Sequence, residues 1–277
     1  MKKLALSLAL LVVVAAVAPA LRPAADGGSI TTIVLPSSLL PASMNVNVAL
    51  PDDYGRDTAT RYPVVYMLNG HGGNNASWGS LVPLDSLASV HDLIIVCPDG
   101  MNSWYFDSPR RSDMQMESFI VEELVPYIDS HYRTLARPES RAITGLSMGG
   151  HGALWLAIRH KDLFRNAGST SGGVDFTPWP GSWNIREMLG ERDTDPEVWR
   201  THTVASLIPG LNPGDLNIIF DCGTEDFFYD VNCALDSALN SRHIPHVYRT
   251  SPGAHNGAYW SRSILPQLEY FTSVLTR

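Results

Sequence analysis

A serine flanked by glycines offers the clearest chemistry in the sequence. Ser147 lies between Gly145 and Gly149 in a Gly-x-Ser-x-Gly pattern. An apolar run (142–146) precedes it and a helix-forming run (153–158) follows it. This order predicts a strand, a sharp turn and a helix, an arrangement that lifts a nucleophilic hydroxyl clear of a sheet. The pattern alone also fits a plain strand–helix turn, so its meaning depends on partner residues elsewhere.

A serine nucleophile needs a base, which is commonly a histidine held by a buried carboxylate. In this arrangement the acid and then the histidine follow the serine along the chain, each after a strand. His255 has this position, because it lies between an expected last strand (246–251) and a closing helix (258–275). We therefore predict His255 as the base, with an exposed loop histidine as the alternative. Other histidines lie on expected helices or at a helix–strand turn: His131, His151, His160, His202, His243 and His246.

The acid should follow the expected strand 216–221, where several carboxylates lie close together. Asp221 belongs to the strand itself and comes too early. Asp230 is better suited to opening the next helix, where a carboxylate meets the positive end of the helix dipole. The loop between them holds Glu225 and Asp226. Asp226 is the first choice and Glu225 its main rival, and the residues alone do not separate the two.

Negative charge that develops on an ester carbonyl oxygen needs aimed N–H donors. One donor is the backbone of Met148, directly after the nucleophile. The second is expected in the glycine-dense loop 69–73, where a backbone can approach a substrate closely. His71 is the best placed residue of that loop, and a tight turn without a binding role is the alternative.

Nothing in the sequence calls for a metal or an organic cofactor. The pair His243-x-x-His246 crosses a break between a helix and a strand, and no dinucleotide fingerprint or phosphate loop is present.

Three cysteines without dense spacing do not indicate a disulfide framework. Cys97 and Cys222 end apolar runs and are expected to be small buried side chains. A bond between Cys222 and Cys233 is possible but not expected.

Strand-like and helix-like segments alternate along the chain, which predicts an α/β fold with a mostly parallel sheet and helices on both faces. Residues 172–213 differ, because they hold several tryptophans and prolines and only short helical pieces, and they are predicted as an insertion over the sheet. The strands are expected at 30–50 (one or two strands), 62–68, 93–97, 142–146, 165–171, 216–221 and 246–251. The helices are expected at 112–132 with a kink at Pro126, after Ser147, at 228–242 and at 258–275.

The first 20 residues have the pattern of a secretory signal peptide. Lys2 and Lys3 precede an apolar stretch (4–17) and a small-residue cleavage site ending at Ala20. A retained anchor is the alternative. Cleavage of 20 of the 277 residues would leave 257, which suits one domain (21–277), and loss of both lysines would move the net charge from −8 to −10. An exported acidic protein is expected, with neither nucleic acid nor anionic membrane as a partner.

Four stretches together resemble the esterase family that includes acetylxylan and feruloyl esterases of carbohydrate esterase family 1, S-formylglutathione hydrolases and mycolyltransferases. The resemblance implies an α/β-hydrolase fold with Ser147, Asp226 and His255 as the catalytic triad, and it favours Asp226 over Glu225. This sequence departs from the family at Asn69, where histidine is usual. The four stretches are 145–154, 98–109, 222–227 and 252–255.

The expected reaction is two-step acyl transfer to water through an acyl-serine. The resemblance and the signal peptide favour acylated plant polysaccharide, with acetylxylan or feruloyl esters, as the substrate. General short-chain carboxylesterase, acyltransferase and secreted carbohydrate-binding protein are the alternatives, and no oligomeric state is predicted. Four aromatic side chains could flank a sugar or a cinnamoyl ring: Trp104, Tyr105, Trp179 and Trp183. The alternative is that they only pack the loop and the insertion.

Overall fold

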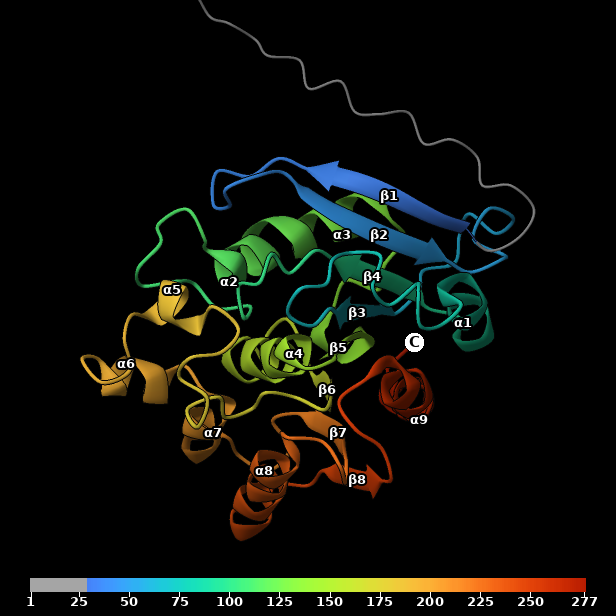
Figure 1. Ribbon diagram of the computed structural model, residues 1–277. Coiled ribbons are helices and arrows are strands. Elements are labelled where there is room, and N and C mark those ends of the chain that lie inside the picture. The colour runs from blue at the N-terminus through green and yellow to red at the C-terminus, as the bar shows by residue number, and fades with distance from the viewer. Residues whose placement is uncertain (1–28) are drawn as a thin grey trace, which may run out of the picture.

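The computed structural model describes residues 29–277, so the expected signal peptide (1–20) lies outside the described residues. One eight-stranded sheet runs through the molecule in the order β1-β2-β4-β3-β5-β6-β7-β8 (Figure 1). The strands are β1 (Ser29–Leu35), β2 (Met44–Leu50), β3 (Val64–Leu68), β4 (Ile94–Pro98), β5 (Arg141–Gly145), β6 (Asn166–Thr170), β7 (Asn217–Gly223) and β8 (Val247–Ser251).

The sheet is antiparallel only at one edge. β1 pairs with β2 and β2 with β4 in antiparallel fashion, and every pair from β4 to β8 is parallel. All residues of β3, β4, β5 and β6 are buried, as expected for strands covered on both faces. The mostly parallel sheet predicted from the alternation of elements is therefore confirmed.

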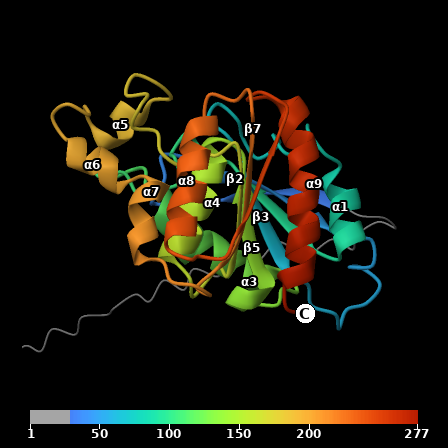
Figure 2. The ribbon, with the colours of Figure 1, turned by 90° about the horizontal axis from the view of Figure 1, so that it is seen from below.

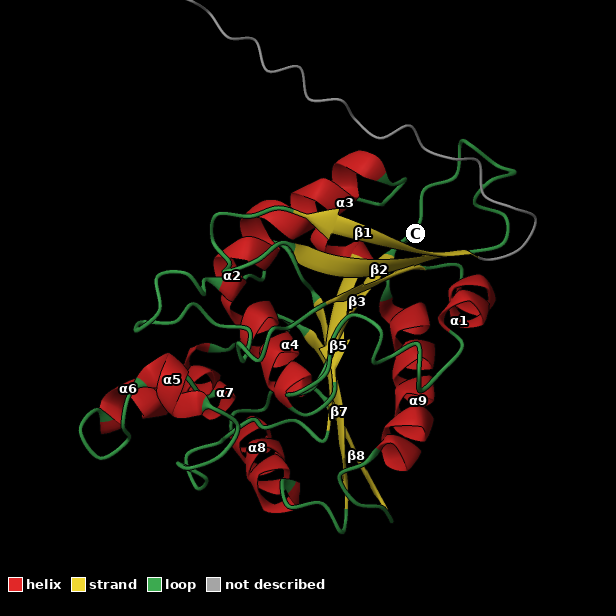
Figure 3. Ribbon diagram, turned by 45° about the horizontal axis from the view of Figure 1, so that its top comes forward, coloured by secondary structure: helices red, strands yellow, loops and turns green. Residues whose placement is uncertain are grey.

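Helices cover both faces of the sheet, which is seen edge-on between them in Figure 3. Figure 2 shows α1 (Leu84–His91) and α9 (Gly257–Val274) on one side and α4 (Met148–Arg159) and α8 (Tyr229–Ser241) on the other. Each side buries its own apolar cluster against the sheet. Between residues 29 and 277 no helix is long and apolar enough to cross a membrane.

The long helix expected at 112–132 is shorter and less regular than predicted. It begins with α2 (Met116–Ser118), because the Asp107 carboxylate accepts the Ser118 backbone N–H at 2.9 Å and fixes the start. A π-helical segment (Phe119–Leu124) leads into α3 (Val125–His131). Pro126 lies in the first turn of α3, where its missing N–H is tolerated. The π-helical turn, which is wider than an α-helical turn, directly precedes it.

The connection from β6 to β7 carries the short helices α5 (Ile185–Leu189), α6 (Pro196–Thr201) and α7 (Val204–Leu207), followed by a 3₁₀ turn (Ile208–Gly210). These helices lie on the α4 side of the sheet, in yellow and orange in Figure 1. Phe176 and Trp199 of this connection are fully buried in the same apolar cluster as α4, so the segment is packed onto the fold.

Candidate active site

The turn between β5 and α4 holds Ser147 in a rare backbone conformation. Its φ of 56° and ψ of −117° are unusual for a residue with a side chain and mark local strain. A Cβ added at Gly149 would lie 2.3 Å from the Leu68 carbonyl oxygen, and one at Gly145 would lie 2.4 Å from the Gly149 backbone. Only glycine fits these two positions, as the sequence pattern predicts.

A continuous hydrogen-bonded chain runs from this serine to a buried carboxylate. The Ser147 Oγ lies 2.9 Å from Nε2 of His255, and Nδ1 of His255 lies 2.8 Å from Oδ2 of Asp226. His255 follows β8 and Asp226 follows β7, so parallel strands deliver both side chains to the same edge of the sheet as the β5–α4 turn. The structure thus brings together the three residues that the sequence singled out.

The two neighbouring carboxylates after β7 have opposite surroundings. The side chain of Asp226 is fully buried, and its Oδ1 also accepts the Phe228 backbone N–H at 2.8 Å. Glu225 is exposed. Asp221 lies within β7 and Asp230 in the first turn of α8, as expected. Asp226 alone among these carboxylates touches His255, which resolves the alternative left open by the sequence.

Two backbone N–H groups beside Ser147 are available to a substrate. Met148 is the first residue of α4, so its N–H has no partner inside the helix. In the described part of the chain, neither this N–H nor that of His71 has an acceptor. The loop of His71 lies against the nucleophile, since a Cβ added at Gly70 would be 3.3 Å from the Ser147 Cβ. Burial lowers the pKa of the His71 imidazole, which is therefore neutral at pH 7.

Asn69, where this chain departs from the family pattern, anchors that loop. Its Oδ1 accepts the Gly100 backbone N–H at 2.9 Å and the Tyr105 hydroxyl at 3.1 Å. Its Nδ2 donates to the Gly70 carbonyl at 2.9 Å. Asn69 is 1% exposed, so these bonds are made without competition from water. The sequence shows the departure at Asn69 but not these partners, because Gly100 and Tyr105 come from a distant loop.

Two of the four aromatic residues predicted to flank a substrate do not reach one. Trp104 and Tyr105 are 1% and 0% exposed. The Tyr105 hydroxyl donates to the Asn69 carbonyl, and Trp104 packs edge-on against Phe176 at 5.0 Å between ring centroids. Their prediction as substrate contacts is wrong, because the aromatic loop folds beneath the site and supports it.

Ser147 lies at the wall of a cleft of about 340 Å³. Ser147 and His255 lie in its wall together with the glycine loop, Trp183 and Trp260. Trp183 is thus placed where a substrate would pass. Trp179 lies behind it, with 6.0 Å between the ring centroids, and packs edge-on against Phe228.

Other candidate groups take part in different interactions. All three cysteines are free thiols, and burial raises the pKa of Cys97 and Cys222. His246 pairs with Asp236 at 2.8 Å. Among residues 29–277, no group of three or more His, Cys, Asp or Glu side chains is arranged to hold a metal ion.

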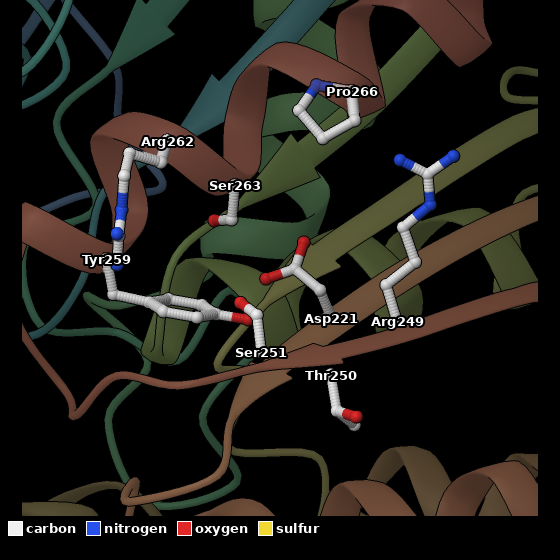
Figure 4. Close-up of a pocket in the computed structure, with 8 residues that line it drawn as sticks. All are labelled: Asp221, Arg249, Thr250, Ser251, Tyr259, Arg262, Ser263 and Pro266. Atoms are coloured by element: carbon white, nitrogen blue, oxygen red, sulfur yellow. The ribbon is translucent and has the colours of Figure 1, made fainter.

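A second cavity, of about 410 Å³, lies between β8 and α9 and contains none of the three triad residues (Figure 4). The carboxylate of Asp221 points into it from β7, with Arg249 on β8 and Arg262 on α9 at its sides. Both oxygens of Asp221 already accept protein hydrogen bonds, from Thr170 and Gln267. This cavity therefore surrounds a structural polar network and not the reacting serine.

Comparison with known proteins gives the context of this geometry. The model of the family described as "Putative esterase" matches residues 37–271. The chain belongs to this esterase family. Esterase Rv1288 of Mycobacterium tuberculosis is 37% identical over 239 residues, which cover 76% of this chain. The chain spans about half of that relative, 52% of its length. An acetyl esterase of Caldicellulosiruptor saccharolyticus is 25% identical over 225 residues, covering 76% of this chain and 83% of its own.

Solved structures of esterases share the fold. A ferulic acid esterase superimposes with a TM-score of 0.79 at 25% identity, covering 91% of this chain and 100% of its own. An S-formylglutathione hydrolase from Agrobacterium tumefaciens gives a TM-score of 0.78 at 24% identity, covering 91% and 98%. The fold of this family member is therefore the α/β-hydrolase fold that its sequence motifs predict.

Proposed function

We propose that this chain is an exported serine carboxylic-ester hydrolase that acts through an acyl-enzyme. The observation that carries the proposal is the hydrogen-bonded chain from Ser147 through His255 to the buried Asp226, which opens into a cleft. Family membership supports the reaction class. The basic, then apolar, then small-residue start of the sequence supports export.

In the first step the Ser147 Oγ attacks the ester carbonyl carbon while Nε2 of His255 takes its proton. Asp226 accepts the Nδ1–H of the same ring, which fixes the reactive tautomer and stabilises the cation that forms. The tetrahedral intermediate collapses as Nε2 returns the proton to the leaving alcohol oxygen. Water then attacks the acyl-serine while Nε2 of His255 takes its proton. The bond from the acyl carbon to Ser147 Oγ breaks as Nε2 returns this proton to Oγ, and the free acid leaves.

The oxyanion of each tetrahedral intermediate needs donors that are already in place. The N–H groups of Met148 and His71 fill this role, since both flank Ser147 and neither has another acceptor within residues 29–277. Met148 adds the positive end of the α4 dipole. Such fixed donors stabilise the transition state more than the ground state and contribute roughly 3–4 kcal/mol each.

We propose acylated plant polysaccharide as the substrate class, with acetyl or feruloyl esters. The names of two similar proteins, an acetyl esterase and a ferulic acid esterase, support this assignment. So does the cleft, because Trp183 and Trp260 line it and aromatic faces stack on sugar rings or on a cinnamoyl ring. Export would bring the enzyme to a polymer that cannot enter a cell.

The proposal is tested by replacing the nucleophile. Ser147→Ala should lower kcat for p-nitrophenyl acetate by about 10⁴-fold or more and abolish labelling by a fluorophosphonate. Ser237→Ala removes an exposed serine of α8 and is the matched control. A wild-type protein that neither turns over the ester nor takes the label would refute the enzyme assignment.

The substrate class is tested with a panel of acetylated xylan, methyl ferulate and short nitrophenyl esters. Turnover of either plant-derived ester supports the polysaccharide assignment. Turnover restricted to nitrophenyl esters would favour a general short-chain carboxylesterase. Appearance of acylated sugar instead of free acid, when an oligosaccharide is added, would favour acyl transfer.

A further inference from the structure

An exposed aromatic ring touches the catalytic histidine. Phe227 is 46% exposed, and its ring centroid lies 4.3 Å from that of His255. Among residues 29–277, five large apolar side chains are exposed, and Phe227 is the aromatic member of the set. It follows Asp226 directly, so the carboxylate faces inward to the imidazole while the next side chain faces solvent. An exposed ring in direct contact with His255 can also touch a molecule that is bound there.

Phe227 packs against the aromatic wall of the cleft. Its ring is nearly parallel to that of Trp183, at 19° with 5.7 Å between centroids, and Trp183 lies in the cleft with Ser147. Trp183 is held in a left-handed backbone conformation (φ 53°), and the indole N–H of Trp104 donates to its carbonyl at 3.3 Å. A residue with a side chain adopts this conformation only where its surroundings enforce it. The backbone of Trp183 is therefore anchored to the loop of Trp104 beneath the site.

The hydrogen bond between His255 and Ser147 decides which half of an ester these rings meet. Nε2 of His255 must deliver its proton to the oxygen of the leaving alcohol. The alcohol portion therefore lies against the imidazole during acylation. Phe227 packs on that imidazole and on Trp183 of the cleft wall, so an alcohol portion that rests on His255 lies next to this ring.

The polar groups around Phe227 indicate what kind of alcohol fits. A hollow on the same side of His255 is lined by Phe227 and by three exposed polar residues, Thr224, Glu225 and Asp230. A pyranose has a C–H face that stacks on an aromatic ring and a rim of hydroxyls that donate to carboxylates. Two carboxylates disfavour an anionic alcohol such as a uronate, so a neutral sugar matches this surface.

We infer that Phe227, with Trp183, forms a subsite for a neutral sugar ring on the alcohol side of the ester. This inference rests on the proposed function for the order of the chemical steps. The rings of Phe227 and Trp183, called the aromatic platform below, are thereby assigned to the sugar and not to an aromatic acyl group.

The kinetic test holds the acyl group constant and changes the alcohol. The readout is the ratio of kcat/KM for acetylated xylo-oligosaccharide to kcat/KM for ethyl acetate, whose alcohol is too small to reach the platform. Phe227→Ala and Phe227→Leu should lower this ratio about tenfold, mainly through KM for the oligosaccharide, and Phe227→Tyr should preserve it. Leu265→Ala, which trims an exposed apolar side chain of α9, is the matched control and should leave the ratio unchanged.

A binding measurement keeps this test separate from that of the proposed function. Calorimetry with unacetylated xylohexaose should show binding to the wild-type chain and about tenfold weaker binding to Phe227→Ala. If no ester is turned over but this loss of binding is seen, the proposed function fails and the subsite stands.

Equal losses for ethyl acetate and for the oligosaccharide would show that Phe227 only supports His255. A selective loss of methyl ferulate turnover would assign the ring to the acyl group. Either of these last two results overturns the inference.

Discussion

Asp226 and Glu225 are adjacent carboxylates, and burial alone assigns them different roles. The side chain of Asp226 is fully buried against His255, whereas Glu225 is in solvent. A carboxylate fixes the histidine tautomer only if it accepts the Nδ1–H, and Asp226 does so with both oxygens, at 2.8 and 3.0 Å. In the proposed mechanism, Asp226 is therefore the acid and Glu225 has no role in orienting His255.

Asp226→Asn should lower kcat by about 10⁴-fold at neutral pH while the fold is kept, because the amide can hold the ring in the wrong tautomer. Glu225→Gln should change kcat less than about threefold. Both variants remove one negative charge, so the second controls for the first. Turnover of p-nitrophenyl acetate measures the effect, and circular dichroism checks the fold. A larger loss in Glu225→Gln than in Asp226→Asn would contradict the assignment.

The sequence was most informative about residues with chemical constraints and least informative about aromatic side chains. Serine, acid and histidine could be placed because each must follow a strand in a fixed order. No such order predicts which aromatic side chains are buried. Trp104 and Tyr105 lie beneath the site, although they are aromatic like Trp183, which lines the cleft. The exposed position of Phe227 beside His255 was not predicted for the same reason, since exposure is decided by distant segments that pack around a residue.

At the scale of elements, the β5–α4 turn requires the backbones of β3, β5 and α4 to approach one another very closely. The Gly149 Cα faces the Leu68 carbonyl of β3, and an added Cβ would come within 2.3 Å of its oxygen. Backbone atoms cannot rotate away as a flexible side chain can. The strain at Ser147 is thus maintained by packing between β3, β5 and α4.

Gly149→Ala should destabilise the protein by roughly 1–3 kcal/mol or more, because a methyl group is forced into the β3 backbone. Any folded fraction should lose activity, since Ser147 and the Met148 N–H shift together. Gly181→Ala is the matched control, because nothing lies within 4 Å of the added Cβ there. Thermal denaturation and p-nitrophenyl acetate turnover measure both effects. Equal melting temperatures for the two variants would argue against backbone contact as the reason for the glycine.

Most element types were predictable from periodicity, but α1 was not expected and helix ends could not be placed. The start of α2 depends on the bond from Ser118 to the Asp107 carboxylate, eleven residues earlier. The apolar spacing of 112–132 also did not predict the π-helical segment that directly precedes Pro126. The strand order also lay beyond the sequence, because pairing between distant strands is set by how whole elements cover the two faces.

For the whole molecule, one buried polar network ties together the elements that carry the triad. Gln267 of α9 accepts the Thr144 hydroxyl of β5 at 2.6 Å and donates to Asp221 of β7 at 2.6 Å. Asp221 also accepts the Thr170 hydroxyl of β6 at 2.5 Å, and the Thr170 carbonyl accepts the Ser147 N–H at 3.0 Å. The network therefore joins three neighbouring strands to α9, and Figure 4 shows Asp221 directed from β7 toward that helix.

This network predicts how stability depends on pH. Burial raises the pKa of Asp221 from 3.8 to about 6, although hydrogen bonds from Thr170 and Gln267 partly oppose the shift. A carboxyl that binds its proton more tightly in the folded state contributes stability that is present below the unfolded pKa and lost as pH rises through the folded pKa. The contribution of Asp221 should thus decline between about pH 4 and pH 6, by about 3 kcal/mol in total.

Asp221→Asn removes this titration, and the amide can still accept from Gln267 and donate to the Thr170 hydroxyl. The free energy of unfolding of the variant minus that of wild type should therefore increase by about 3 kcal/mol from pH 4 to pH 8, because only wild type loses stability over this range. Urea denaturation at a series of pH values measures this difference, and Asp162→Asn controls for the loss of one exposed carboxylate. A difference that stays constant across this range would mean that Asp221 is already charged in the folded protein at pH 4. In that case its four-element network would be held by an ion whose charge the hydrogen bonds fully compensate.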